Sequence, residues 1–213
     1  GTIEGEWTCD VTPNDGIEDG SSASATVTVA SQCALTDCDY SVDLGNDIGV
    51  DFVEIDVSEG DPLGRYTLSS NFYLMTTEVT QGMFEAVRGY NPSSFSSCGD
   101  NCPVEKVTWY ESAAMANELS VLEGLAECYS CTGSDSSVEC EEHPDYSGQN
   151  IYDCLGYRLP TEAEWELAAR SGTTNDFWTP DGGGNSSDDY SCDGNETIQD
   201  GVSNPLLGDY AWY

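Results

Sequence analysis

The chain has 213 residues, of which 38% are hydrophobic, and its 40 acidic residues against 5 basic ones give a net charge of −35. A field of that sign repels phosphate backbones and anionic headgroups, so the composition disfavours nucleic acid and membrane surfaces as partners. No apolar run is long enough to cross a bilayer, so no membrane insertion is expected. Aromatic and aliphatic residues occur along the whole length, which predicts a packed core rather than a disordered acidic tail.

The cysteine content indicates a disulfide framework. Ten cysteines stand beside a single histidine, His143, so zinc sites built from cysteine and histidine are disfavoured. The pairs Cys98/Cys102 and Cys128/Cys131 have zinc-like spacing, but they lie in acidic, loop-like surroundings. Oxidised cysteine pairs are typical of an oxidising compartment, so we expect an extracellular or cell-surface protein.

Cysteine spacing predicts four local disulfides and leaves two cysteines over. Cys131 and Cys140 flank a GSDSS turn and should pair across a hairpin, inside a second bond that closes the same insertion. The predicted bonds are Cys131–Cys140, Cys128–Cys154, Cys98–Cys102 and Cys33–Cys38. Cys9 and Cys192 have no local partner, so we expect them to be unpaired or to bond to another chain.

Residues 1–30 predict a β-hairpin around the turn PNDG at residues 13–16. Apolar positions alternate with polar ones in both halves: Trp7, Cys9 and Val11, then Ala25, Val27 and Val29. Two strands cannot bury their apolar faces alone, and their open edges invite pairing with other strands. We therefore expect residues 1–30 to pack against another chain or another copy of this one, or to complete a sandwich with further strands.

The segments that follow divide by composition. Residues 31–49 are polar and turn-rich and are predicted to be a linker. From residue 50 the character changes: residues 52–55 and 66–75 predict strands, the second leading into a helix near residues 80–88. Residues 124–156 form a Cys- and Gly-rich insertion, and loops are expected from residue 172 onward.

Two further helices begin with capping boxes, in which a threonine hydroxyl and a glutamate three positions later satisfy free backbone N–H groups. Thr108 and Glu111 open the first, and Thr161 and Glu164 open the second. The second helix is expected to end at Gly172. The residues expected on the inner faces are Trp109, Ala113, Ala116 and Leu119 for the first helix and Trp165, Ala168 and Ala169 for the second.

Three segments, in this order and spacing, resemble the formylglycine-generating enzyme (sulfatase-modifying factor) family. They are residues 72–80 (FYLMTTEVT), 102–109 (CPVEKVTW) and 156–170 (GYRLPTEAEWELAAR). The resemblance covers residues 50–213 and implies an α+β domain with a variant C-type-lectin-like fold and little regular structure. Residues 1–30 resemble the last hairpin of a bacterial immunoglobulin-like surface repeat. The expected organisation is therefore a partial immunoglobulin-like domain at 1–30, a linker at 31–49 and an incomplete family domain at 50–213.

The third segment can be explained by architecture alone. Arg158 precedes a helix start and can pair with a carboxylate of the acidic first turn, Glu162 or Glu164. Pro160 and Thr161 fix the entry of the chain into the helix, and Trp165 is expected to supply a large buried anchor. We therefore interpret this segment as structural rather than catalytic.

The resemblance also bears on activity. Catalytic members carry a copper-binding cysteine pair late in the domain, after a Gly-Asn-Val-Trp-Glu-Trp-like segment. No residue of this chain matches those cysteines, and the sequence ends at residues 209–213 (DYAWY), just before that half is expected to begin. No catalytic residue is therefore predicted.

Residues 181–189 contain oxygen-bearing side chains that suit Ca²⁺ without matching the spacing of an EF-hand. The candidate calcium ligands are Asp181, Asn185, Asp188 and Asp189. Asn185 and Asn195 also begin glycosylation sequons, so a glycan is a further possible partner.

Three functions fit these observations. The first is a non-catalytic, disulfide-stabilised surface module for binding, display or assembly. The second is a fragment of a formylglycine-generating oxidase whose catalytic half lies elsewhere, and the third is a structural subunit of an extracellular filament. Sequence beyond residue 213 would separate the first two, because a paired cysteine motif there would favour the enzyme.

Overall fold

The computed structural model describes residues 39–58, 60–175 and 178, together with the backbone of four short strands outside that block. Two of these strands, β1 (Gly5–Val11) and β2 (Ala23–Val29), pair antiparallel with Trp7 opposite Val27, so the predicted N-terminal hairpin forms. The other two are β8 (Asn185–Ser186) and β9 (Ile198–Gln199). The predicted Cys33–Cys38 bond, the side chain of Cys9, and Cys192 lie outside the described residues.

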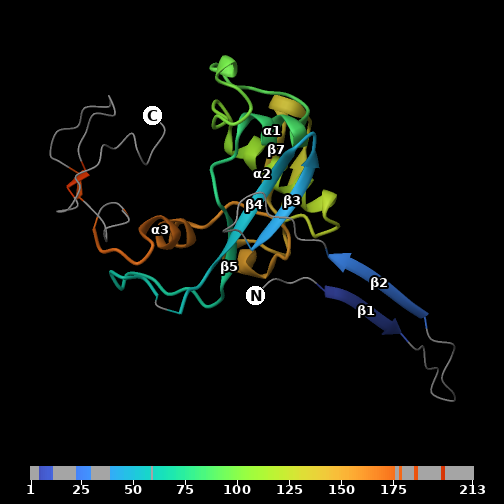
Figure 1. Cartoon of the computed structure of the whole chain (residues 1–213), viewed down its shortest axis with the longest axis horizontal. Helices are drawn as coiled ribbons and strands as arrows, with labels where there is room; N and C mark the ends of the chain where they lie inside the picture. The colour runs from blue at the N-terminus through green and yellow to red at the C-terminus, as the bar shows by residue number, and fades with distance from the viewer. Residues whose placement is uncertain are drawn as a thin grey trace.

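A three-stranded antiparallel sheet lies at the centre of the domain, in the order β3-β4-β5 (Figure 1). Its strands are β3 (Tyr40–Gly45), β4 (Ile48–Ile55) and β5 (Phe72–Met75). Asn46 and Asp47 join β3 to β4 with φ values of 54° and 61°, the left-handed conformation that suits a two-residue hairpin turn.

The expectation of a linker over residues 31–49 is wrong from residue 40 onward. Val42 is 1% exposed and pairs with Val50, which is fully buried, so β3 contributes directly to the core. Tyr40, Val42 and Leu44 follow the period-two pattern of a strand with one buried face. The domain therefore begins earlier than the change in composition at residue 50 indicated.

The second predicted strand is also shorter than expected, because only residues 72–75 of the predicted 66–75 join the sheet. Upstream of it, the carboxylate of Asp61 accepts hydrogen bonds from the backbone N–H groups of Leu63 (3.1 Å) and Arg65 (2.6 Å). A side chain that binds its own backbone in this way holds a turn and competes with strand pairing.

Three α-helices follow in the described part of the chain: α1 (Gln81–Arg88), α2 (Trp109–Leu122) and α3 (Glu162–Arg170). The predicted capping boxes of α2 and α3 are both confirmed, with Thr108 bonded to Glu111 and Thr161 to Glu164. α3 ends at Arg170 and its left-handed cap is Ser171, with φ 43°, one residue before the predicted Gly172. No helix among the described residues is both long and apolar enough to cross a membrane.

The N-terminus of α1 is covered by the loop that the Cys98–Cys102 disulfide closes. The carbonyl oxygen of Cys102 accepts the N–H of Gln81 at 2.8 Å, and that of Asp100 accepts the N–H of Gly82 at 2.9 Å. These are two of the N–H groups that a helix start leaves without an internal partner. The small disulfide loop, which begins at η1 (Ser96–Cys98), therefore serves as a cap for the helix.

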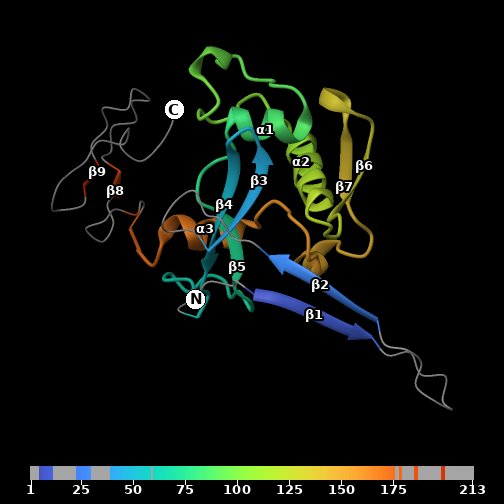
Figure 2. The same cartoon turned by 45° about the vertical axis from the view of Figure 1, so that its right-hand side comes forward.

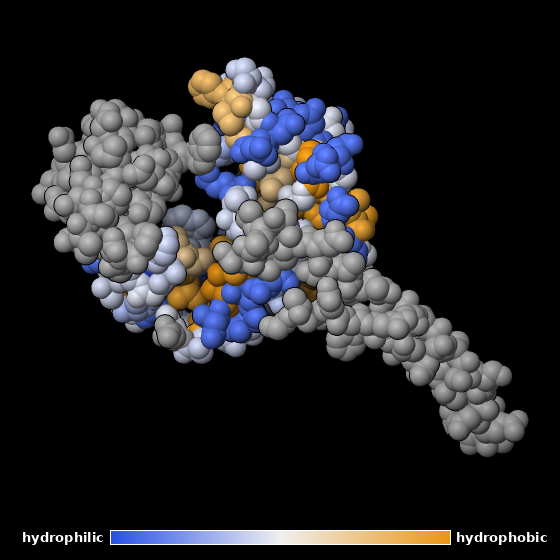
Figure 3. All heavy atoms as spheres, in the orientation of Figure 1, coloured by the Kyte–Doolittle hydropathy of each residue, from blue (hydrophilic) through white to orange (hydrophobic). Residues whose placement is uncertain are grey.

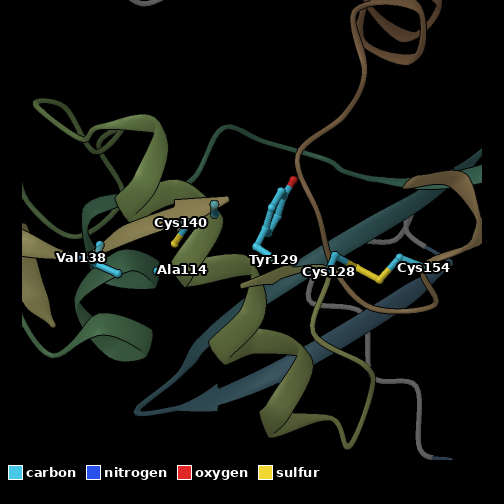
Figure 4. Packing of buried hydrophobic residues seen from close by; sticks show 7 residues of the cluster. Ala114, Cys128, Tyr129, Val138, Cys140 and Cys154 are labelled. Atoms are coloured by element: carbon cyan, nitrogen blue, oxygen red, sulfur yellow. A yellow bond between two sulfur atoms is a disulfide. The ribbon is translucent and has the colours of Figure 1, made fainter. Parts of the chain in front are cut away.

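Helix α2 lies between the central sheet and a second hairpin (Figure 2). That hairpin consists of β6 (Tyr129–Thr132) and β7 (Glu139–Glu142), joined through η2 (Asp135–Ser137). Cys131 lies directly opposite Cys140 and bonds to it, and Cys128 bonds to Cys154 beyond η3 (Gly148–Asp153), as predicted. Cys128, Cys140 and Cys154 belong to one buried cluster with Ala113 and Ala114 of α2, and Cys131 packs against it. Figure 4 shows the Cys128–Cys154 bond within this cluster.

A second buried cluster joins α2 to the sheet and contains Val42, Val50, Phe52 and Leu119. The ring of Tyr157 stacks on Phe52 with centroids 5.3 Å apart, and its hydroxyl meets that of Tyr40 at 3.1 Å. Tyr40 in turn donates to Glu123 at 2.6 Å. These contacts hold the start of residues 156–170, the third segment that resembles the family, against the sheet.

The predicted inner face of α2 is correct at three of its four positions. Ala113 and Leu119 are buried and Ala116 packs partly against the first cluster, but Trp109 is 48% exposed. Trp109 is the first residue of the helix, and its indole packs edge-on against Tyr129 and Tyr110 instead of entering the core.

Figure 3 shows hydrophobic patches among hydrophilic residues on the coloured face of the molecule.

The Cys128–Cys154 and Cys98–Cys102 disulfides close loops of different length, so their removal should lower the free energy of unfolding by different amounts. Replacing Cys128 and Cys154 with alanine opens a separation of 26 residues, whereas replacing Cys98 and Cys102 opens one of 4. Loop-closure entropy predicts a loss of about 3.5 kcal/mol for the first double variant and about 2 kcal/mol for the second. Denaturant unfolding of both variants measures the difference, and an equal or larger loss for the Cys98/Cys102 variant would contradict it.

Candidate functional site

Arg158 and Glu164 form a buried, bidentate ion pair at the start of α3. The two terminal guanidinium nitrogens of Arg158 donate to the two carboxylate oxygens of Glu164, each at 2.7 Å. The side chains are 14% and 3% exposed. Parallel paired hydrogen bonds of this kind are the strongest contacts that arginine makes with carboxylates. Of the two partners that the sequence proposed for Arg158, the structure selects Glu164 over Glu162.

The same carboxylate completes the cap of α3. One oxygen of Glu164 accepts the backbone N–H of Thr161 at 2.8 Å and its hydroxyl at 3.0 Å, while the Thr161 hydroxyl oxygen accepts the N–H of Glu164 at 3.3 Å. Burial alone would raise the pKa of Glu164, but the hydrogen bonds from Arg158 and Thr161 and the positive charge of Arg158 outweigh it. The pKa of Glu164 is therefore lowered from its ordinary value of 4.5.

Glycine at position 156 is required by a close approach that the sequence analysis missed. A Cβ at this position would lie 1.8 Å from the carbonyl oxygen of Ala126 and 2.8 Å from the hydroxyl of Ser120. The same Ser120 hydroxyl accepts the N–H of Tyr157 at 2.8 Å. Gly156 therefore lets the chain pass close to the C-terminal end of α2. This route brings Arg158 to the start of α3.

Trp165 is not the buried anchor that the sequence predicted, because its side chain is 61% exposed. The inward residues of α3 are Glu164 and Leu167, whereas Ala168 is half-buried and Ala169 is exposed. Positions three apart share a helix face, so the ion pair that turns Glu164 inward also turns Leu167 inward. Trp165, one residue further along, then points away from the core.

A cleft of about 440 Å³ lies beside this ion pair. One wall is the turn at residues 61–66, another is the first turn of α3, and Tyr152 of η3 closes a third side. Figure 1 shows α3 lying away from α1 and α2. The side chains that line the cleft include Arg65, Tyr66, Tyr152, Thr161, Glu162 and Glu166.

Arg65 is held in place by carboxylates on both sides. It contacts Asp61 at 3.1 Å and Glu166 at 2.8 Å, and Glu166 also contacts Arg170 at 2.9 Å. Hydrogen bonds from Arg65, and then from Arg170, hold the pKa of Glu166 below its ordinary value. The four charges form a chain that fixes the guanidinium at the edge of the cleft.

The two tyrosines of the cleft differ in their hydrogen bonding. The hydroxyl of Tyr152 bonds to the hydroxyl of Thr161 at 3.2 Å, and the guanidinium of Arg158 lies over its ring at 5.4 Å from the centroid. The hydroxyl of Tyr66 is buried and has no hydrogen-bond partner among the described residues. Burial, with the nearby charges of Asp61 and Glu166, raises the pKa of Tyr66.

Four of the five residues predicted to have a structural role in residues 156–170 lie together at the start of α3. Arg158, Thr161 and Glu164 form the pair and the cap, Pro160 lies exposed between Arg158 and Thr161, and Trp165 departs from its expected buried position. The cleft itself was not foreseen, since it joins residues almost a hundred positions apart. Within the residues that the structure describes, no group of acidic, cysteine or histidine side chains is arranged to hold a metal ion. The candidate calcium ligands Asp181, Asn185, Asp188 and Asp189 fall outside the described side chains.

Comparison with known proteins places the chain in a family. The family model described as "Sulfatase-modifying factor enzyme 1-like domain" matches residues 39–210, and the chain therefore belongs to this family. The match begins just before β3, in agreement with the structure and earlier than residue 50.

Among curated proteins, "Chaperone protein LppX" from Paenibacillus barcinonensis is 34% identical over 148 residues, which is 67% of this chain and 50% of that protein. The chain thus spans about half the length of this relative. Among solved structures, "Treponema denticola variable protein 1" is 28% identical with a TM-score of 0.48, over 64% of this chain and 58% of that one. CarF is 27% identical with a TM-score of 0.42, over 58% and 57% of the two chains.

The buried pair predicts an asymmetric response to mutation. Arg158→Met leaves the Glu164 carboxylate buried without its cation, which should lower the free energy of unfolding by about 3–5 kcal/mol. Adding Glu164→Gln removes that charge and keeps a side chain able to complete the capping box, so the double variant should recover about half of the loss. Lys106→Met, a change at an exposed cation, is the control for loss of a positive charge. Equal stability of Arg158→Met and Lys106→Met would contradict the structural role of the pair.

Proposed function

We propose that this chain is a non-catalytic binding module, stabilised by disulfides and working outside the cell or at a cell surface. One observation carries the proposal: Arg158 and Glu164, the buried charged residues of its most family-specific segment, are already bound to each other. Glu164 accepts from Arg158 and from Thr161 and is 3% exposed, so it is poorly placed to exchange protons with a substrate. The family alone does not decide activity, because one fold carries many functions.

The cysteines support the same proposal. All six cysteines whose side chains the structure describes are in disulfides, and a disulfide sulfur is not available as the thiolate that nucleophilic or metal-binding chemistry needs. Three disulfides in one domain are typical of an oxidising compartment, which supports an extracellular location. In this proposal the domain keeps the variant C-type-lectin-like character of its family and displays a surface for a ligand.

The comparisons support binding rather than chemistry in one respect. The LppX protein of P. barcinonensis is named a chaperone protein, and a protein ligand is therefore one candidate for this chain. A protein partner also fits the N-terminal hairpin, whose two strands pair only with each other among the described strands. Open strand edges of this kind suit pairing with another chain or a second copy, as in an immunoglobulin-like sandwich or a filament.

A direct assay separates this proposal from the oxidase alternative. The whole chain is incubated with copper, oxygen and a peptide that carries a sulfatase-type cysteine, and the peptide is analysed by mass spectrometry. We expect no formylglycine above a control without protein, whereas a catalytic member of the family converts the peptide in parallel. Turnover by this chain above the blank would refute the proposal.

A further inference from the structure

The cleft beside α3 offers hydrogen-bond donors and acceptors at the same place. Glu162 lies in its wall, and its carboxylate has no partner among the described residues. The backbone N–H groups of Glu162 and Ala163 are the first two of α3 and likewise find no acceptor within the described part of the chain. Arg65 adds a guanidinium that its carboxylate partners hold in a fixed position.

The charges of the cleft select against ions of either sign. An anion would approach a protein of net charge −35 and meet Glu162 and Glu166 in the wall. A metal ion would find too few ligands, because Glu166 is already paired with Arg65 and Arg170 and the described residues contain no group of acidic, cysteine or histidine side chains arranged to hold one. A neutral ligand with several hydroxyl groups meets neither penalty, because each hydroxyl can donate to a carboxylate and accept from a guanidinium or amide.

The aromatic rings add an apolar surface of suitable size. Tyr152 is 45% exposed, and Tyr66 lines the same cleft with its hydroxyl buried and unpaired among the described residues. Tyrosine rings of this kind combine an apolar face with a polar tip. The volume of about 440 Å³ lies within the range of about 300–1,000 Å³ that small-molecule sites occupy.

From these groups we infer that the cleft lined by Arg65, Tyr66, Tyr152, Glu162 and Glu166 binds a sugar residue of a glycan. The C–H face of the sugar ring packs on Tyr152, while its hydroxyls donate to Glu162 and accept from Arg65 and from the first N–H groups of α3. This inference rests on the proposed binding function and names the ligand class that the module takes.

Saturation-transfer NMR on the whole chain tests the assignment, with methyl glycosides of glucose, galactose, mannose and N-acetylglucosamine as probes at millimolar concentration. We expect transfer to at least one glycoside. Tyr152→Leu should weaken that binding by about tenfold and Glu162→Gln by about fivefold, which correspond to the loss of one packing surface and one hydrogen-bond acceptor.

Two matched variants show whether such losses are specific to the cleft. Tyr73→Leu changes a tyrosine of similar exposure, 47%, in β5, and Glu139→Gln changes an exposed carboxylate in β7. Both should bind the glycoside as the unchanged chain does, and thermal unfolding verifies that all four variants are folded.

Absence of transfer to every glycoside, or unchanged binding by folded Tyr152→Leu and Glu162→Gln, would overturn the inference. Preferential binding of a lysine-rich peptide that depends on Glu162 would also overturn it, because the cleft would then select a cation. None of these outcomes affects the non-catalytic proposal, which the peptide turnover assay decides separately.

Discussion

The buried pair between Arg158 and Glu164 is the interaction on which the arrangement of the site depends. Removing two opposite charges from water is costly, and only close paired contacts with further hydrogen bonds offset that cost. Here the guanidinium holds both carboxylate oxygens at 2.7 Å, and Thr161 adds two more hydrogen bonds. The pair therefore fixes where α3 begins and which face it turns inward, and it leaves the first turn of the helix to form a wall of the cleft.

The route of the chain into this pair depends on contacts made elsewhere. Gly156 passes against Ala126 and Ser120 at the end of α2, and Tyr157 stacks on Phe52 of the sheet. Tyr129, beside the Cys128–Cys154 disulfide, accepts the N–H of Leu159 through its hydroxyl at 3.0 Å. The Cys128–Cys154 disulfide, the sheet and α2 thus position one short segment.

Features determined by near neighbours in the sequence could be predicted, and features determined by tertiary contacts could not. The capping boxes at Thr108 and Thr161 and the bond between Cys131 and Cys140 follow from spacings of a few residues. The burial of β3 depends on its pairing with β4. The exposure of Trp165 depends on whether Arg158 forms its ion pair with Glu162 or with Glu164. The cleft joins a turn near Arg65 to a helix a hundred residues later, a proximity that no local pattern contains.

Under the proposed function, the motif around Glu164 is structural rather than catalytic. The most direct test is the ionisation of that carboxyl, followed by NMR of the side-chain carbon as the pH of the folded protein is lowered. A structural partner of Arg158 should titrate below the ordinary value of 4.5, since its charged form is the bonded one. A pKa raised above 4.5, as in a carboxyl kept protonated to act as a general acid, would contradict the account.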